Sequence, residues 1–226
     1  MLVSDRQVLD HLVEHAPDYL TATDALLRSV HYFIRSHTHR ATDDGVVRSR
    51  LVNHASNDLH ELITASLHGN GRSMLRTARS LFEVAVGARD IPSSTEMSER
   101  YLEHDEATDA LVFDLERLAD FTDIRPQSVR HARRKGARAL EAGVDRWGAA
   151  WRTNWAGRSV RDRAHDVGLG RDYDTFYRFA SQPTHAAAGG VYGTQRPIDG
   201  YSVIRFGPAL AACPIGLIYG LAYFQL

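Results

Sequence analysis

The residues with the clearest potential for chemistry lie between positions 173 and 185. Tyr173, Tyr177 and Ser181 are spaced four apart, so one face of a helix would carry all three, with Arg178 beside it. His185 follows Arg178 after six intervening residues. An imidazole at this position could take the proton of an RNA 2′-hydroxyl, while the guanidinium stabilises the charge of the phosphorane. Ser181 or Tyr177 would position the phosphate, and we expect no metal ion and no cofactor.

A proline determines where His185 is expected. Pro183 disfavours helical backbone at Gln182 and suits the first turn of a new helix. His185 would then lie in that first turn, where the helix dipole favours the neutral imidazole that acts as a base. The alternative is structural: Ser181 and His185 cap the helix break, and the two tyrosine rings pack into the core.

A second group of polar residues lies on an otherwise apolar helix. Arg79 and Glu83 have the spacing of an ion pair within one helix, with Arg76 one turn earlier. Glu83 could orient His185 or Arg178 from across the bundle, as carboxylates do for catalytic side chains. A partly buried structural ion pair is the alternative.

One basic stretch could contact nucleic acid. Arg130, Arg134 and Arg138 share a helix face, and the same stretch continues through Arg133, Lys135, Arg146 and Arg152. Such a face could follow a phosphate backbone with salt-dependent affinity that is independent of sequence. More often such a run of charges is a solvated face, and the nearby acids at positions 116, 120 and 123 could neutralise it.

Histidine pairs suggest metal sites that we do not expect to form. His11, Glu14 and His15 form the pattern H-x-x-E-H, in which two histidines hold zinc and the glutamate activates water. The chain has 12 histidines, so accidental pairs are common, and neither a third ligand nor the large α/β domain of such enzymes is visible. His37 and His39 lie in an expected loop. We therefore predict no metal site.

Composition narrows the class of protein. The 226 residues are 43% hydrophobic and 24% charged, which is typical of a single folded domain and excludes disordered or fibrous chains. The net charge of −1 lacks the basic excess of many nucleic-acid-binding proteins. Cys213 is the only cysteine, and the first thirteen residues do not form a secretory signal. We expect a cytoplasmic protein.

Apolar residues recur with helical spacing along most of the chain. The pattern predicts a single all-α domain, residues 1–226, a bundle of about seven to nine helices. Helices are expected in residues 8–37 with a division at Pro17, and in 46–67, 73–90, 95–121, 126–147, 160–167 and 172–181. Residues 151–157 should form a loop anchored by Trp151 and Trp155. Residues 189–200 are expected to be a loop, and only residues 201–206 have a weak strand pattern.

The last 21 residues, 206–226, carry no charge. This length suits a membrane span, and Gly216 and Gly220 have the spacing at which membrane helices pack together. Pro208 and Pro214 interrupt the stretch, and no basic residue follows it. We predict a buried last helix of the bundle, so that membrane association is the less favoured alternative.

Two stretches resemble a known family. Both resemble motifs of an uncharacterised bacterial all-helical family, domain of unknown function 5677. The first stretch is residues 76–91, and the second is the series Trp155-Ala-Gly-Arg-Ser, Tyr173, Tyr177-Arg178, Ser181 and His185. The resemblance covers residues 48–188 and implies an α-helical intracellular protein without an established activity.

That family is distantly similar to HEPN helical bundles. Their ribonuclease members use an arginine, four to six residues and then a histidine, which Arg178 and His185 match, although Phe179 stands where a polar residue is common. This similarity implies RNA cleavage or RNA binding, and a homodimer. The alternative is a non-catalytic module that binds a protein partner, such as an adaptor in a stress or defence system.

Overall fold

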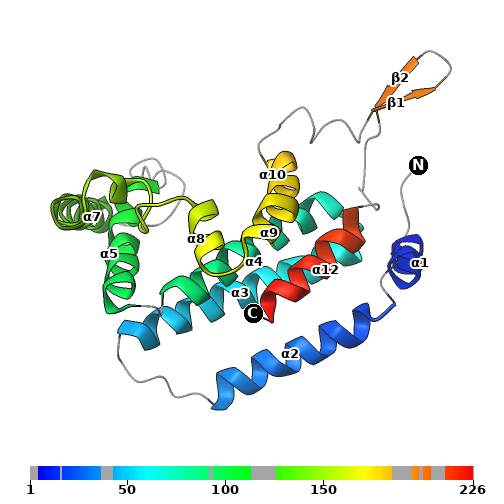
Figure 1. Ribbon diagram of the computed structural model, residues 1–226, viewed down its shortest axis with the longest axis horizontal. Helices are drawn as coiled ribbons and strands as arrows, with labels where there is room; N and C mark the ends of the chain where they lie inside the picture. Colours follow the sequence, from blue (N-terminus) through cyan, green and yellow to red (C-terminus); the bar gives the residue numbers. More distant parts are fainter. Residues whose placement is uncertain are drawn as a thin grey trace.

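The protein is a multi-helix all-α bundle, which confirms the predicted fold class (Figure 1). This computed structural model describes residues 5–15, 17–36, 43–91, 94–112, 126–184, 195–198, 201–204 and 212–225. The described helices match the apolar periodicity of the sequence closely in position.

Two long antiparallel helices form the centre of the bundle. They are α3 (Asp43–Leu67) and α4 (Gly71–Asp90), which run side by side in Figure 1. Asn70 starts α4, because its side-chain oxygen accepts a hydrogen bond from the Ser73 backbone N–H at 3.2 Å. The apolar face of α4, with Phe82 fully buried, forms much of the main core.

The apolar tail packs onto this pair as α12 (Cys213–Phe224). The predicted helix is therefore confirmed for these residues, while 206–211 lie outside the described part. Gly216 and Gly220 face α4 and α3, where added Cβ atoms would lie 2.8 Å from the Met74 side chain and 2.5 Å from that of Leu62. Among the described residues, no helix has the length and apolar character to cross a membrane.

The first two helices pack beside α12. α1 (Asp5–His15) contacts α3 and α12, and α2 (Tyr19–Ser36) contacts α12. Pro17 and Asp18 form the turn between them, as predicted. Their buried residues Val8, Leu12 and Leu26 join the main core.

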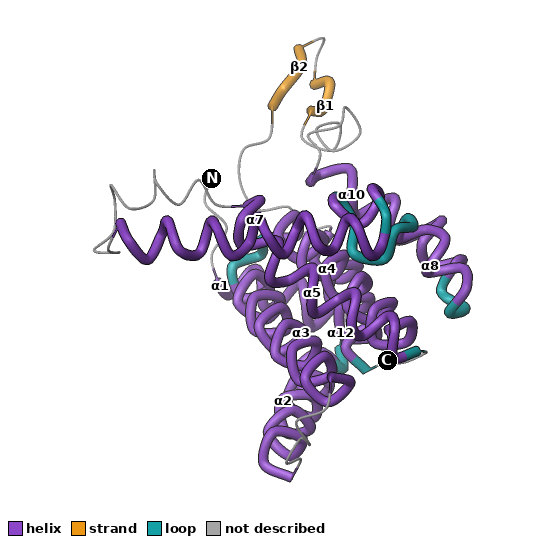
Figure 2. Tube along the Cα trace, turned by 90° about the vertical axis from the view of Figure 1, so that its left-hand side faces the viewer, coloured by secondary structure: helices purple, strands orange, loops and turns teal. Residues whose placement is uncertain are grey.

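A second pair of helices packs at the other end of α3. It consists of α5 (Thr95–Val112) and α7 (Pro126–Trp147), and Figure 2 shows α7 across the face turned to the viewer. Trp151, in the 3₁₀ turn η2 (Ala149–Arg152), is fully buried against them. The predicted Trp151 anchor is confirmed. The predicted extension of α5 to residue 121 lies outside the described residues.

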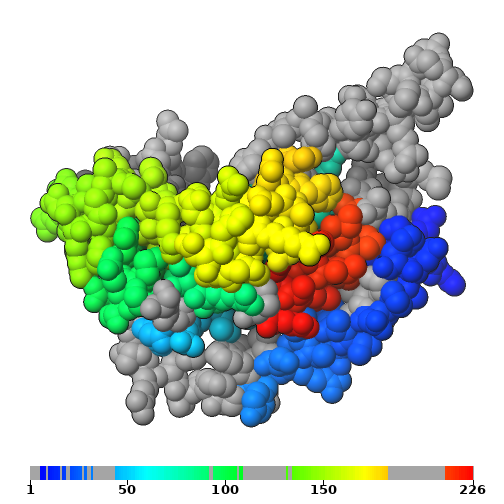
Figure 3. All heavy atoms as spheres, viewed as in Figure 1, coloured from blue at the N-terminus to red at the C-terminus, as the bar shows by residue number. Residues whose placement is uncertain are grey.

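The segment that carries the predicted site lies over α4. It contains α8 (Val160–Asp166), α9 (Gly170–Asp172), the π-helical turn η3 (Tyr173–Tyr177) and α10 (Arg178–Thr184), and Figure 3 shows these residues covering one face. The helix predicted for 172–181 is confirmed. The break predicted at Gln182 is wrong, because α10 continues to Thr184. A proline in the last turn removes one backbone hydrogen bond without ending the helix.

A short antiparallel hairpin accompanies the helices. β1 (Gln195–Ile198) pairs with β2 (Tyr201–Ile204), with Ile198 opposite Tyr201. The weak strand pattern of residues 201–206 is thus confirmed for β2, whereas the loop expected for 189–200 is wrong over β1. Pro197 fits there because each strand of a two-stranded sheet is an edge.

Candidate functional site

Three predicted residues meet where η3 crosses α4. The Tyr177 hydroxyl donates to Glu83 Oε1 at 2.8 Å and accepts from Arg79 Nη2 at 2.9 Å. Arg79 and Glu83 form the predicted ion pair at 3.0 Å, with side chains 21% and 41% exposed. The network joins residues almost one hundred positions apart. Glu83 therefore contacts Tyr177, and through it the start of α10.

Burial gives the Tyr177 phenol a neutral, hydrogen-bonding role. Its ring lies 5.2 Å from that of Phe82 and stacks on Tyr173 at 4.8 Å between centroids. Burial raises the pKa of Tyr177 to about 12; the hydrogen bond from Arg79 lowers it, and the charge of Glu83 raises it. The phenol is protonated at neutral pH and fixes α10 to α4.

Ser181 is held within its own helix. Its hydroxyl donates to the Tyr177 backbone oxygen at 2.7 Å, and the side chain is partly buried. Such back-bonding is common for serine inside helices. The hydroxyl hydrogen would have to move before Ser181 could donate to a phosphate.

Arg178 lies on the outer face of α10. Its side chain is exposed, and among the described residues its guanidinium has no ion pair or hydrogen bond. The next residue, Phe179, is 44% exposed, and Gln182 is exposed one turn later. His185 lies outside the described residues, so its distance from Arg178 is not given by the structure.

A second polar cluster, not predicted from the sequence, joins the end of α4 to α8. Asp90, 4% exposed, accepts from Arg163 Nε at 2.7 Å and from Arg158 Nη2 at 2.6 Å. Arg158 also pairs with Asp166, and the Arg163 guanidinium lies 4.3 Å from the Trp155 ring centroid. In the sequence, the signal for this cluster is an aspartate at the end of an apolar helix. A carboxylate is unfavourable at that position unless a cation lies beside it.

This cluster explains the Trp155-Ala-Gly-Arg-Ser motif. Trp155 packs edge-on against Tyr101 at 5.2 Å, so the predicted anchor is present. Gly157 has φ +67°, and an added Cβ would lie 2.8 Å from the Arg100 guanidinium, so only glycine fits without strain. Ser159 caps α8, as predicted, by accepting from the Asp162 N–H at 3.1 Å. The motif thus docks α8 onto α4.

The basic face of α7 is partly described. Arg134 and Arg138 are exposed, while the side chain of Arg130 lies outside the described residues. Arg146 is neutralised by Glu99 and Glu103. The acids expected to neutralise the rest of this face, at 116, 120 and 123, also lie outside.

The two histidines of α1 interact with each other within that helix. His15 Nδ1 lies 2.9 Å from the His11 backbone oxygen, and the two rings are 4.2 Å apart. No group of three or more metal-ligating side chains occurs within the described ranges. His37 and His39 fall in the gap between 36 and 43.

Comparison with known proteins supports the resemblance found in the motifs. No curated protein and no solved structure matches the chain. A family of unknown function, DUF5677, matches residues 46–194, a range that contains α4, the Trp155 motif and α10. This span is more than half of the chain and agrees with the predicted range of 48–188. The chain therefore belongs to the DUF5677 family.

Proposed function

We propose that the outer face of α10 binds single-stranded RNA and cleaves it without a metal ion. The observation that supports this proposal is the pair of adjacent residues Arg178 and Phe179, an exposed cation without a described partner and an exposed aromatic ring. Arginine binds phosphate, and aromatic rings stack on unpaired bases, so this combination suits single-stranded RNA.

The proposed reaction is attack by the RNA 2′-oxygen on the adjacent phosphorus. His185 takes the 2′-hydroxyl proton, Arg178 stabilises the non-bridging oxygens, and the bond to the 5′-oxygen breaks. The products are a 2′,3′-cyclic phosphate and a 5′-hydroxyl, whose proton comes from solvent. The HEPN-like spacing of Arg178 and His185 supports this assignment.

The remaining predicted residues would position α10 and extend the contact. The hydrogen bonds of Tyr177 and Ser181, and the link from Tyr177 to Glu83, favour a positioning role over direct contact with phosphate. Arg130, Arg134 and Arg138 on α7 would add phosphate contacts whose strength falls with salt.

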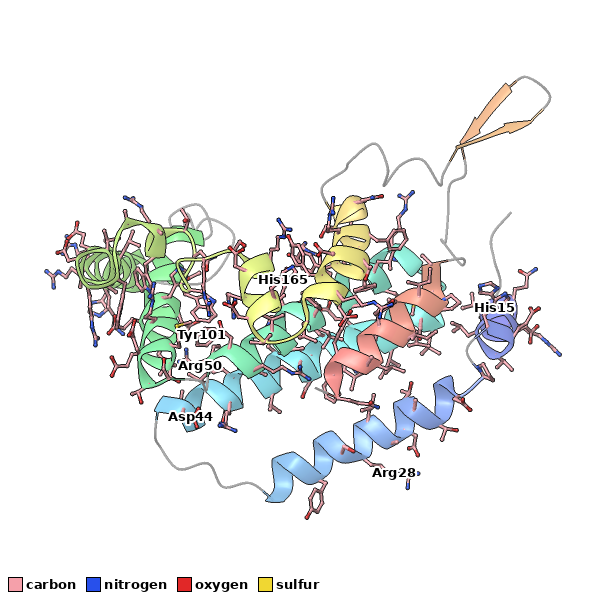
Figure 4. The ribbon with its side chains drawn as sticks, viewed as in Figure 1. His15, Arg28, Asp44, Arg50, Tyr101 and His165 are labelled. Carbon is pink, nitrogen blue, oxygen red and sulfur yellow. The ribbon has the colours of Figure 1, made fainter. Side chains whose placement is uncertain are left out.

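The test is cleavage of a mixed panel of labelled RNAs in EDTA by the wild-type protein, Arg178→Ala and His185→Ala. Arg28→Ala is the matched control, because Arg28 is an exposed arginine on α2, on the side away from α10 (Figure 4). We expect the wild type and the control to cleave RNA and His185→Ala to lose cleavage while still binding. Binding measured by fluorescence anisotropy should weaken in Arg178→Ala, with a salt slope smaller by about one. No binding of any RNA by the folded wild-type protein would refute the proposal.

A non-catalytic interaction module is the second candidate. It is favoured by the internal hydrogen bonds of Tyr177, Ser181 and Glu83, which leave Arg178 and Phe179 as a surface that a protein partner could cover. If the folded wild-type protein neither binds nor cleaves any RNA of the panel, this candidate replaces the first, and a protein partner is to be sought.

We also propose that the protein acts in the cytoplasm as a homodimer. The chain has one cysteine, so it cannot form a disulfide bond within itself, and this suits a reducing compartment. That cysteine, Cys213, is buried in α12. Light scattering after size-exclusion chromatography would test the dimer, and a monomer at micromolar concentration would contradict it.

A further inference from the structure

A small pocket lies between α3, α4, α5 and the loop that carries Trp155. Its volume is about 200 Å³. Two aromatic side chains, Trp155 and Tyr101, form part of its wall together with aliphatic groups of Leu51 and Val84. Figure 4 shows Tyr101 where α5 meets α3. Glu83 is one of its lining residues, whereas Arg178 and Phe179, on which the proposed RNA contact rests, are not.

A buried cation contributes to the lining of this pocket without using all of its donors. Arg163 is 5% exposed, donates Nε–H to Asp90, and stacks over Trp155. Its Nη2 atom is fully buried and has no hydrogen-bond partner. Buried donors in folded proteins almost always have an acceptor, so an unpaired guanidinium nitrogen beside a cavity indicates that an acceptor belongs there.

A glycine lies next to this nitrogen. Gly87 lies inside α4, and an added Cβ would be 3.7 Å from Leu51 and Ile91 and 3.8 Å from Arg163 Nη2. These are ordinary contact distances, so alanine would fit and would favour the helix. The sequence therefore has the less favourable helix residue at the point where a side chain would approach the free donor.

We propose that this pocket binds a small carboxylate with an apolar body of about the size of benzoate. The carboxylate accepts from Arg163 Nη2 once the groups that cover this buried nitrogen move aside, and the body packs against Trp155 and Tyr101. A cavity of about 150 Å³ accommodates benzene, so the volume suits one ring and a carboxylate. A single free guanidinium nitrogen suits one negative charge, and Glu83, elsewhere in the lining, disfavours the double charge of a phosphate ester.

Tyr101 provides a second donor in the lining. Burial raises the pKa of its phenol, and the charge of Asp105 raises it further, so the hydroxyl keeps its proton at neutral pH. A neutral phenol beside a guanidinium favours an anionic acceptor over a cationic ligand.

The test is a titration of the full chain with benzoate, followed by the tryptophan indole N–H signals in a ¹H–¹⁵N NMR spectrum. Benzoate should shift the Trp155 signal with saturation at a Kd of roughly 1 mM, the affinity of an efficient ligand of nine heavy atoms. Trp147 lies outside the pocket lining, and its signal should stay in place. Benzamide, the neutral isostere, should shift Trp155 at least tenfold more weakly.

Two variants at one position separate binding from folding. Gly87→Met places a long side chain in the pocket and should abolish the shift, whereas Gly87→Ala should fold at least as stably as the wild type and retain weaker binding. No saturable Trp155 shift at about 20 mM benzoate would overturn the proposal. Equal shifts with benzamide, or undiminished binding by folded Gly87→Met, would also overturn it. None of these readouts involves RNA, so the result is independent of the function proposed for α10.

Discussion

The close packing of α12 predicts that alanine destabilises the protein more at one of two glycines, one turn apart, than at the other. A Cβ at Gly216 would lie 2.8 Å from Met74 Cβ, 3.0 Å from the Met74 backbone carbon and 3.2 Å from the Leu75 backbone nitrogen. A Cβ at Gly220 would meet the end of the Leu62 side chain at 2.5 Å. At the first site the obstacle is the α4 backbone, whereas at the second it is a flexible methyl group.

The magnitudes follow from two opposing effects. Alanine in place of glycine inside a helix stabilises a protein by about 0.5–1 kcal/mol. Overpacking a core costs about 1–3 kcal/mol, at the upper end when backbone must move. Gly216→Ala should therefore lower the free energy of unfolding by about 1–2 kcal/mol. Gly220→Ala should change the free energy of unfolding by less than about 1 kcal/mol. The Leu62 side chain can rotate away from the new methyl group, and the small cost of that rotation offsets the gain in helix propensity.

Urea denaturation followed by circular dichroism measures both variants against the wild type. The dependence of the free energy on urea concentration should be equal in all three, which confirms that the same surface is exposed on unfolding. If Gly216→Ala proves as stable as Gly220→Ala, α12 does not lie in close contact with the α4 backbone, and the helix order of the core must be revised.

Three further substitutions test the polar contacts. Tyr177→Phe removes the hydrogen bond to Glu83 and should lower the free energy of unfolding by about 1–2 kcal/mol, measured in urea, and a change near zero would contradict the network. Asp90→Asn leaves the Arg163 charge buried without its counterion and should cost about 3 kcal/mol by the same measurement, so full wild-type stability would exclude a buried ion pair. Burial lowers the pKa of His104 below its usual 6.5, so its stabilising effect is present above pH 6.5 and is lost as the pH falls through its lowered pKa. His104→Gln should therefore lose stability less steeply between pH 7 and 5 than the wild type, and parallel curves would refute the assignment.

The helices could be predicted because their signals are local. The apolar spacing of α4 and the turn at Asn70 act within a few residues, and the structure places that helix within two residues of the predicted start. The Arg79–Glu83 pair follows from spacing alone. Its bonds to Tyr177 do not, because they cross more than ninety positions and depend on how η3 lies over α4.

The Asp90 cluster shows why long-range polar contacts escape sequence reasoning. Asp90 ends a helix, and Arg158 and Arg163 stand near the start of another, so each has an ordinary local explanation. The contact between these three side chains depends on the turn that Gly157 makes with positive φ and on Trp155, which packs against Tyr101 and Arg163. Neither fact is encoded by periodicity. The π-helical turn at Tyr173–Tyr177 is missed for the same reason, since its i to i+5 bonds leave no separate residue pattern.

The two stretches that resemble the family converge on one face of α4. Glu83, Gly87 and Asp90 follow one another at spacings of four and three, so they lie on the same side of the helix. Glu83 ties this face to Tyr177 and Asp90 ties it to Arg163. Gly87 lies between these two hydrogen-bonded residues on the helix and lines the pocket. A helix face that is fixed at both ends holds the pocket wall formed by its middle in place, which is the arrangement that a binding site requires.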